Sequence, residues 1–116
     1  MSEIQQGQVY WLDFGPAAGS APAERHPCVV VQNDVFNRSA IATSVVCLIT
    51  SNLSRGNAPG NVRLKKGEAN LSKASVVNVS QVLTVNKAEL VECVGRLSAA
   101  ATEAVRDGLQ MLFDRL

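Results

Sequence analysis

The 116-residue sequence lacks most of the residue patterns that enzymes use to hold metals or organic cofactors. There is no glycine-rich phosphate loop, and the single histidine and three cysteines are not spaced like zinc ligands. Acidic residues are sparse and nowhere paired as two-metal catalysis requires. A Ser-His-Asp triad stays open, although no nucleophile-elbow motif supports one. We therefore expect any enzymatic activity to need no metal and no cofactor.

Long hydrophobic runs are also missing. The longest, residues 28–31 and 45–49, are far shorter than the roughly 20 residues that a membrane span needs. Residues 1–6 are polar and include Glu3, unlike a secretory signal peptide. The sequence therefore predicts a soluble, cytoplasmic protein with no membrane partner.

Cysteine is too scarce for a disulfide framework. Three is an odd number, and Cys28 and Cys47 lie inside apolar runs. This pattern favours buried free thiols, which behave as small hydrophobic side chains, over a disulfide.

A strong net charge is absent, because 11 Lys and Arg offset 10 Asp and Glu to give +1. This excludes a uniformly basic nucleic-acid binder. The charge is uneven, however, since residues 25–73 hold seven basic and two acidic side chains, a net charge of +5. Hydrophobic residues make up 47% of the chain, which excludes a disordered protein. The length fits a single domain over residues 1–116.

Strand signals dominate the first hundred residues. The segments are rich in β-branched or aromatic residues, or alternate between apolar and polar ones. They are residues 8–14, 28–32, 43–50, 61–65, 75–82 and 92–97. Strands this short and closely spaced predict a mainly β domain, either a small barrel or a strongly curved sheet. The long loops between them are residues 15–27, 52–60 and 66–73, and we expect them to carry function.

The C-terminus carries a helical pattern. Its apolar stripe consists of Ala101, Val105, Leu109, Leu112 and Leu116. Ser98 is placed to cap this helix, which we expect to cover the sheet. Gly108 within it costs about 1 kcal/mol relative to alanine. Asn86 and Glu89 predict one further helical turn before the last strand.

The residues that point to chemistry begin with Arg25 and His26, just before the apolar strand that follows Pro27. An arginine offers a permanently charged fork that matches phosphate, and a histidine gains or loses a proton near about pH 6.5. The pair is typical either of an ordinary polar turn or of an anion site with an acid–base group. The second reading suits phosphoryl chemistry.

Two strand ends are further candidates. Thr50 and Ser51 stand where an apolar strand runs into the basic loop of Arg55. Their hydroxyls either bond the local backbone or face a substrate. Ser80 and Gln81 end another predicted strand, where a glutamine either is a surface amide or reads the edge of a nucleobase.

Several short motifs follow one another along the sequence. In chain order they are GQVYWLDF (7–14), GS (19–20), RHPCVVVQND (25–34) with Asn37, LITS (48–51), GNV (60–62), SQVLTVNK (80–87), VGRL (94–97) and the final helix. Each motif is short, but in their joint order and spacing, over nearly the whole chain, the sequence resembles the MazF/PemK family of bacterial toxins.

The resemblance implies a compact SH3-like β-barrel with a C-terminal helix, usually a homodimer. It implies a metal-independent endoribonuclease that cuts single-stranded RNA at short sequences. It also implies a toxin that a small MazE-type antitoxin partner with an acidic, flexible tail holds inactive.

The family's catalytic pair is an arginine just before this proline and a threonine at the end of the third strand. The threonine matches Thr50, but the arginine's position holds His26, and Arg25 stands one residue earlier. RNA cleavage by its own 2′-hydroxyl needs proton transfer and positive charge, and no protein nucleophile. We therefore predict that His26 transfers protons, Arg25 stabilises the phosphate and Thr50 positions the scissile oxygen.

The same resemblance implies that the basic middle of the chain tracks the RNA backbone. The predicted substrate-binding residues are Ser20, Ser51, Arg55, Lys65 and Gln81. The aromatic residues of the first strand, Tyr10, Trp11 and Phe14, we expect in the core or a dimer interface.

Two other functions stay open. One is a nonenzymatic toxin of the same shape that inhibits DNA gyrase by protein contact. The other is an RNA-binding barrel whose catalysis is weakened because His26 replaces the arginine.

Overall fold

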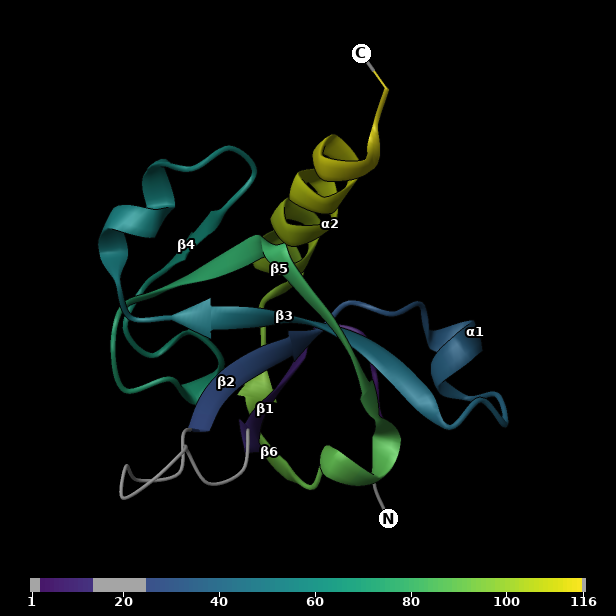
Figure 1. Cartoon of the computed structure of the whole chain (residues 1–116). Helices are drawn as coiled ribbons and strands as arrows, with labels where there is room; N and C mark the ends of the chain where they lie inside the picture. Colours follow the sequence, from purple (N-terminus) through teal and green to yellow (C-terminus); the bar gives the residue numbers. More distant parts are fainter. Residues whose placement is uncertain (1–2, 14–24, 116) are drawn as a thin grey trace, which may run out of the picture.

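The computed structural model describes residues 3–13 and 25–115, which form a six-stranded antiparallel sheet followed by a helix (Figure 1). The strands are β1 (Gln8–Asp13), β2 (Arg25–Val30), β3 (Thr43–Thr50), β4 (Val62–Leu64), β5 (Ser75–Asn86) and β6 (Glu92–Arg96). Their order in the sheet is β4-β5-β3-β2-β1-β6. The helices are α1 (Asp34–Asn37) and α2 (Ala99–Phe113). The sheet curls into a half-barrel, which confirms the predicted mainly β barrel with a C-terminal helix.

β2 begins earlier than the sequence predicted. Arg25, His26 and Pro27 lie within this strand and not in a loop. A proline is tolerated here because β2 pairs with β3 only from Cys28 onward, while Pro27 lies opposite Trp11 of β1. The residues before Arg25 in the predicted loop, and Phe14, lie outside the described residues.

β5 is longer than predicted and passes through a break in its pairing with β3. Cys47 pairs with Val82, and the next residue, Leu48, pairs with Asn78. Residues 79–81 therefore form an irregular stretch inside the strand, so Gln81 does not end it. Bulged stretches of this kind bend a strand and redirect its side chains.

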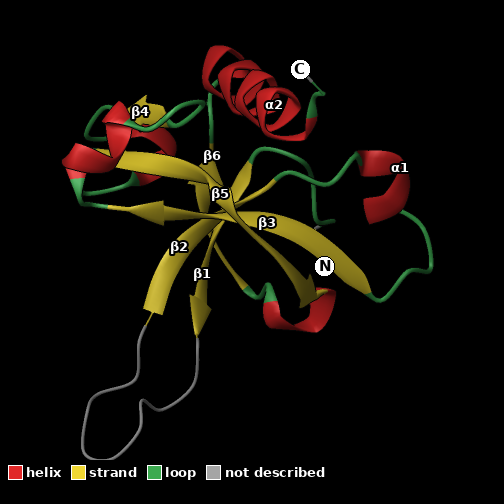
Figure 2. Cartoon of the chain, turned by 45° about the horizontal axis from the view of Figure 1, so that its top comes forward, coloured by secondary structure: helices red, strands yellow, loops and turns green. Residues whose placement is uncertain are grey.

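The sheet packs an apolar cluster against each face, because successive side chains of a strand point to opposite sides. The first cluster includes Val9, Val29, Cys47, Ile49 and Val105 of α2. The second includes Tyr10, Leu12, Cys28, Val30 and Val46. We call the side of the first cluster the helix face, since α2 lies over it (Figure 2), and the other side the opposite face.

The cysteines agree with the prediction of free thiols. All three are free, Cys28 and Cys47 are buried, and Cys93 is exposed. Cys28 and Cys47 belong to clusters on opposite faces, so their sulfur atoms point away from each other. Burial raises the pKa of both thiols from an ordinary value of 9.0 to about 12.

Helix α2 begins and docks largely as its pattern predicts. The Ser98 hydroxyl accepts a hydrogen bond from the Ala101 N–H at 3.1 Å, which caps the first turn. Gly108 is buried, and a Cβ there would overlap the carbonyl oxygen of Gly60. Gly108 therefore lowers the helix propensity of α2 but allows the helix to pack closely against Gly60. Leu112 of the predicted stripe is 44% exposed, because the buried strip shifts toward Gly108, and Leu116 lies outside the described residues.

Two connections are fixed by side chains. Arg63 donates hydrogen bonds to the Leu53 carbonyl at 3.1 Å and to the Asn57 amide oxygen at 3.0 Å, which holds the loop of residues 52–60. Asn86 and Glu89 form the predicted capping box around a single 3-10 turn, Lys87–Glu89. No helix among the described residues is long and apolar enough to cross a membrane.

Candidate functional site

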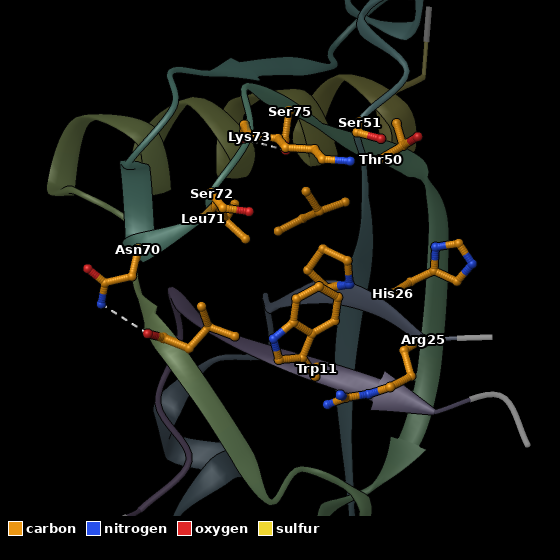
Figure 3. Close-up of a pocket in the computed structure, with 13 residues that line it drawn as sticks. Trp11, Arg25, His26, Thr50, Ser51, Asn70, Leu71, Ser72, Lys73 and Ser75 are labelled. Atoms are coloured by element: carbon orange, nitrogen blue, oxygen red, sulfur yellow. Dashed lines mark hydrogen bonds between the residues drawn. The ribbon is translucent and has the colours of Figure 1, made fainter. Parts of the chain in front are cut away.

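The ends of β2 and β3 separate two neighbouring cavities, and His26, Ile49 and Thr50 line both of them. The Trp11 cavity has a volume of about 430 Å³ (Figure 3). Besides the shared residues it is lined by Trp11, Arg25, Pro27, Ser51, Asn70, Leu71, Ser72, Lys73, Ser75 and Val94. The Gln81 cavity has a volume of about 360 Å³. It is completed by Leu48, Asn52, Arg55, Asn78 and Gln81. The strand ends therefore form a ridge between two hollows.

Strand register decides which side chains share a face. His26 is paired with Leu12 of β1, and Leu12 belongs to the cluster on the opposite face. Thr50 lies two residues after Leu48, which packs against the same cluster, so the Thr50 side chain is also on the opposite face. Both side chains are half-buried. The predicted proton-transfer group and the predicted threonine therefore lie on the same face of the sheet, and both line the two cavities.

Arg25 stands on the helix face, one residue away from His26. Its Nε lies 3.0 Å from Asp13 Oδ1, and its Nη2 lies 2.6 Å from Glu92 Oε1. Its guanidinium carbon lies 5.1 Å from the centre of the Trp11 ring. Figure 3 shows the guanidinium beside the indole, while the His26 ring points away from it. Arg25 therefore lines the Trp11 cavity and not the Gln81 cavity.

Thr50 has a hydroxyl whose direction is partly set by the backbone. Its Oγ1 accepts a hydrogen bond from the Asn52 N–H at 3.1 Å. Because that bond uses an acceptor lone pair, the hydroxyl hydrogen can still donate to another group. This geometry suits contact with an anionic oxygen.

The irregular stretch of β5 places Gln81 in its cavity. Its Oε1 accepts from Asn78 Nδ2 at 3.0 Å, and Asn78 Oδ1 accepts from the Ser80 hydroxyl at 2.9 Å. Gln81 is exposed and Asn78 is only 7% exposed. The buried asparagine therefore fixes the amide oxygen of the exposed glutamine, which leaves the amide N–H groups of Gln81 as the donors for another group.

The structure brings most, but not all, of the predicted site residues together. Ser51 lines the Trp11 cavity and Arg55 lines the Gln81 cavity. Lys65 lines neither of them, because it follows β4 at the far edge of the sheet. Ser20 lies outside the described residues.

Many residues of these cavities were not predicted to be there, and three of them matter for the site. Trp11 was expected in the core or a dimer interface; it is half-buried and lines a cavity, so the core alternative is wrong. Lys73 ends a loop that was predicted to be functional and belongs to the basic segment of residues 25–73, and these were its only signals. Asn78 was not predicted as a site residue, because it belongs to a predicted strand in which apolar and polar residues alternate. Nothing in that pattern indicated that Asn78 is buried.

No group of three or more His, Cys, Asp or Glu side chains in the described ranges is placed to hold a metal ion. The acidic side chains nearest the cavities, Asp13 and Glu92, are paired with Arg25. What the ridge offers is a histidine, a threonine hydroxyl and neighbouring cations, which is a set of groups for proton transfer and anion binding.

Comparison with known proteins gives one family. The family model described as PemK-like, MazF-like toxin of type II toxin–antitoxin systems matches residues 5–113. Endoribonuclease MazF6 of Mycobacterium tuberculosis is 40% identical over 111 residues, covering 96% of this chain and 97% of the relative. Endoribonuclease EndoA of Bacillus subtilis is 28% identical over 108 residues, covering 93% and 92%.

Solved structures share the fold. A MazE–MazF complex from Deinococcus radiodurans has a TM-score of 0.78 at 22% identity, covering 97% of this chain and 96% of that one. A mycobacterial endoribonuclease in complex with its cognate antitoxin has a TM-score of 0.72 at 24% identity, covering 96% and 93%.

Proposed function

The chain belongs to the family of PemK-like, MazF-like toxins, and from this membership we propose that it is an endoribonuclease that cleaves single-stranded RNA at short sequences without a metal ion. The relatives named as endoribonucleases, at 40% and 28% identity over more than nine-tenths of the chain, support RNA cleavage. The observation that carries the mechanism is the placement of His26 and Thr50 on adjacent strand ends, between two cavities.

The proposed reaction is an attack by the RNA on itself. The 2′-oxygen gives up its proton to a base and bonds to the adjacent phosphorus. The bond from phosphorus to the 5′-oxygen breaks, and this oxygen takes up a proton. The products are a 2′,3′-cyclic phosphate and a 5′-hydroxyl. The protein must therefore move protons and stabilise negative charge, and it needs no nucleophile of its own.

His26 is the proposed proton-transfer group. Histidine is the side chain whose ordinary titration range lies closest to working pH, which suits general acid–base catalysis. Thr50 is proposed to hold a phosphate oxygen with its hydroxyl hydrogen, since its Oγ1 already accepts from the Asn52 N–H. Arg55 is proposed to bind the RNA backbone from the Gln81 cavity.

Arg25 is proposed to stabilise a phosphate from the helix face. For this role its guanidinium must exchange Asp13 or Glu92 for the phosphate. The exchange is inexpensive, because the three side chains are 46%, 69% and 59% exposed and ion pairs this exposed contribute about 0–1 kcal/mol. Gln81 is proposed to read a base edge with its amide N–H groups. We also propose that the substrate contacts Ser20, Ser51 and Lys65, as predicted from the sequence.

We also propose that the chain forms a homodimer in the cytoplasm and is held inactive by a MazE-type antitoxin with an acidic tail. The +5 charge of residues 25–73 would attract such a tail. The end of α2 supports a protein partner, since Met111 and Phe113 are 60% and 72% exposed.

The test is cleavage of a long labelled RNA by the parent protein and by His26→Ala and Thr50→Ala. We expect loss of general acid–base catalysis to lower the rate of His26→Ala by about 10²- to 10⁴-fold. Equal rates for the parent and His26→Ala would remove the acid–base assignment. Salt-dependent RNA binding without cleavage would favour the RNA-binding barrel, and gyrase inhibition without cleavage would favour the nonenzymatic toxin.

A further inference from the structure

The Trp11 cavity is an unusual setting for an aromatic side chain. Trp11 lies on an interior strand of the sheet, yet it is half-buried and forms part of a cavity wall instead of joining the apolar cluster. The indole is braced by Arg25, which is itself held by Asp13 and Glu92. One side of the ring therefore contacts a guanidinium, beside the opening of the cavity.

The rim of this cavity is polar and carries a cation. Ser72 and Lys73 are exposed, and Asn70 is held by a hydrogen bond of 3.0 Å from its Nδ2 to the Val94 carbonyl. Figure 3 shows the Lys73 side chain reaching across the cavity toward Thr50 and Ser51. Within the part of the chain that the structure describes, Lys73 forms no ion pair.

The combination of an aromatic wall, hydroxyl and amide groups, and a cation near a proposed cleavage residue matches one chemical class. Unpaired RNA bases stack on aromatic side chains and are read by polar groups at their edges, while lysine neutralises the phosphates. A volume of about 430 Å³ lies within the range of small-molecule sites and leaves room for one nucleotide. The cavity touches the ridge of His26 and Thr50, so a nucleotide held there would be continuous with the strand being cut.

We propose that the Trp11 cavity is a nucleotide subsite, in which the base adjoining the cleaved phosphate packs against Trp11 and its phosphate binds Lys73. The proposal rests on the proposed function, because it takes RNA as the substrate and the ridge as the cleavage point. It assigns Trp11 and Lys73 to substrate binding, while Arg25, in contact with the indole, keeps the phosphate-stabilising role proposed above. The Gln81 cavity then receives the RNA on the other side of the ridge.

The experiment uses the tryptophan itself as the probe, because Trp11 is the only one in the chain. The cleavage sequence is first mapped on the parent protein, and a 2′-fluoro RNA octamer containing it then serves as a ligand that cannot attack its own phosphate. Binding is followed in parallel by the anisotropy of a dye on the octamer and by indole emission. We expect both signals to saturate at the same RNA concentration.

Variants distinguish the loss of a contact with RNA from a loss of folding. Trp11→Leu removes the stacking surface and should weaken octamer binding by about 5- to 100-fold, whereas Trp11→Phe should weaken it by less than about threefold. Lys73→Gln should reduce the slope of log affinity against log salt by about 1, as expected for one lost phosphate contact. Arg106→Gln, which removes a positive charge from the exposed side of α2, should leave the slope unchanged. Thermal unfolding of each variant shows that it is folded.

Two results would overturn the proposal. In the first, the anisotropy of the dye shows that the octamer binds, but indole emission stays constant and Lys73→Gln has the same slope of log affinity against log salt as the parent. RNA then binds outside the Trp11 cavity, so the subsite is wrong although the proposed function still holds. In the second, RNA is neither cut nor bound, so the proposed function fails and the subsite fails with it.

Discussion

The strands that carry His26 and Thr50 should lose their stability at alkaline pH because of two buried thiols. Cys28 lies in β2 and Cys47 in β3, and both side chains are 0% exposed. Burial raises the pKa of each thiol to about 12, since the thiolate would lose its hydration. The perturbation is a change from pH 8 to pH 10, applied to the parent and to a Cys28→Ala/Cys47→Ala double variant.

The direction and size follow from proton linkage. In the unfolded chain a thiol with an ordinary pKa of 9.0 is mostly ionised at pH 10, whereas in the folded protein both thiols keep their protons. Their contribution is therefore complete below about pH 9 and is lost progressively as the pH rises toward about 12. At pH 10 the loss is about 1.4 kcal/mol for each thiol and about 3 kcal/mol for the pair.

The assay is urea unfolding of both proteins at each pH. The double variant starts from a different stability, so the compared quantity is the change between pH 8 and pH 10 within each protein. Burial also raises the pKa of Tyr10, and this largest cause is present in both proteins, whereas the smaller contribution of Cys28 is removed in the double variant. Cys93→Ala, which removes the exposed thiol, should behave like the parent. If parent and double variant lose equal free energy between the two pH values, the buried thiols do not set the alkaline limit.

Four further outcomes are expected. Gly108→Ala should lower the free energy of unfolding by about 1–3 kcal/mol in urea titrations, since its Cβ would overlap the Gly60 carbonyl oxygen; a neutral effect would contradict this packing. A thiol reagent should label one cysteine, Cys93, rapidly in the folded protein and all three after unfolding, and rapid labelling of more than one would show open strands. Arg63→Gln should speed proteolytic cleavage within residues 52–60, because two hydrogen bonds hold that loop, and an unchanged rate would show that other contacts hold it. His26→Arg should lower the cleavage rate, because an arginine side chain keeps its proton and cannot act as a base, and an unchanged rate would place proton transfer on another group.

Much of the fold could be predicted from the spacing of apolar residues in the sequence. The helix buries one strip of side chains, and successive side chains of each strand point to opposite faces of the sheet. The range of β3 matches its prediction at both ends, and α2 begins at the Ser98 cap. What failed depended on tertiary pairing. Pro27 made the start of β2 look like a loop, although pairing with β1 alone supports a strand there. The second half of β5 was missed because its partner, the first half of β3, is distant in sequence.

The residues of the candidate site could be chosen from the sequence by their chemical types, but their arrangement in space could not be predicted. Residue types and the resemblance pointed to Arg25, His26 and Thr50, yet only the register shows that Arg25 faces away from the other two. Lys65 looked equivalent to Lys73, since both are lysines of the basic middle segment. The sheet order separates them, because β4 lies at one edge and Lys73 reaches the ridge from the loop before β5.

The most direct measurement is to map the cleavage ends on a long, structureless RNA with the parent protein and with His26→Ala, each in the presence and absence of EDTA. If the ridge of His26 and Thr50 is a metal-independent cleavage site, the parent cuts at one short sequence in both conditions. Each cut then leaves a 2′,3′-cyclic phosphate and a 5′-hydroxyl, and His26→Ala leaves the RNA essentially whole. Cuts that disappear with EDTA, or that His26→Ala makes at the parent rate, would contradict this assignment.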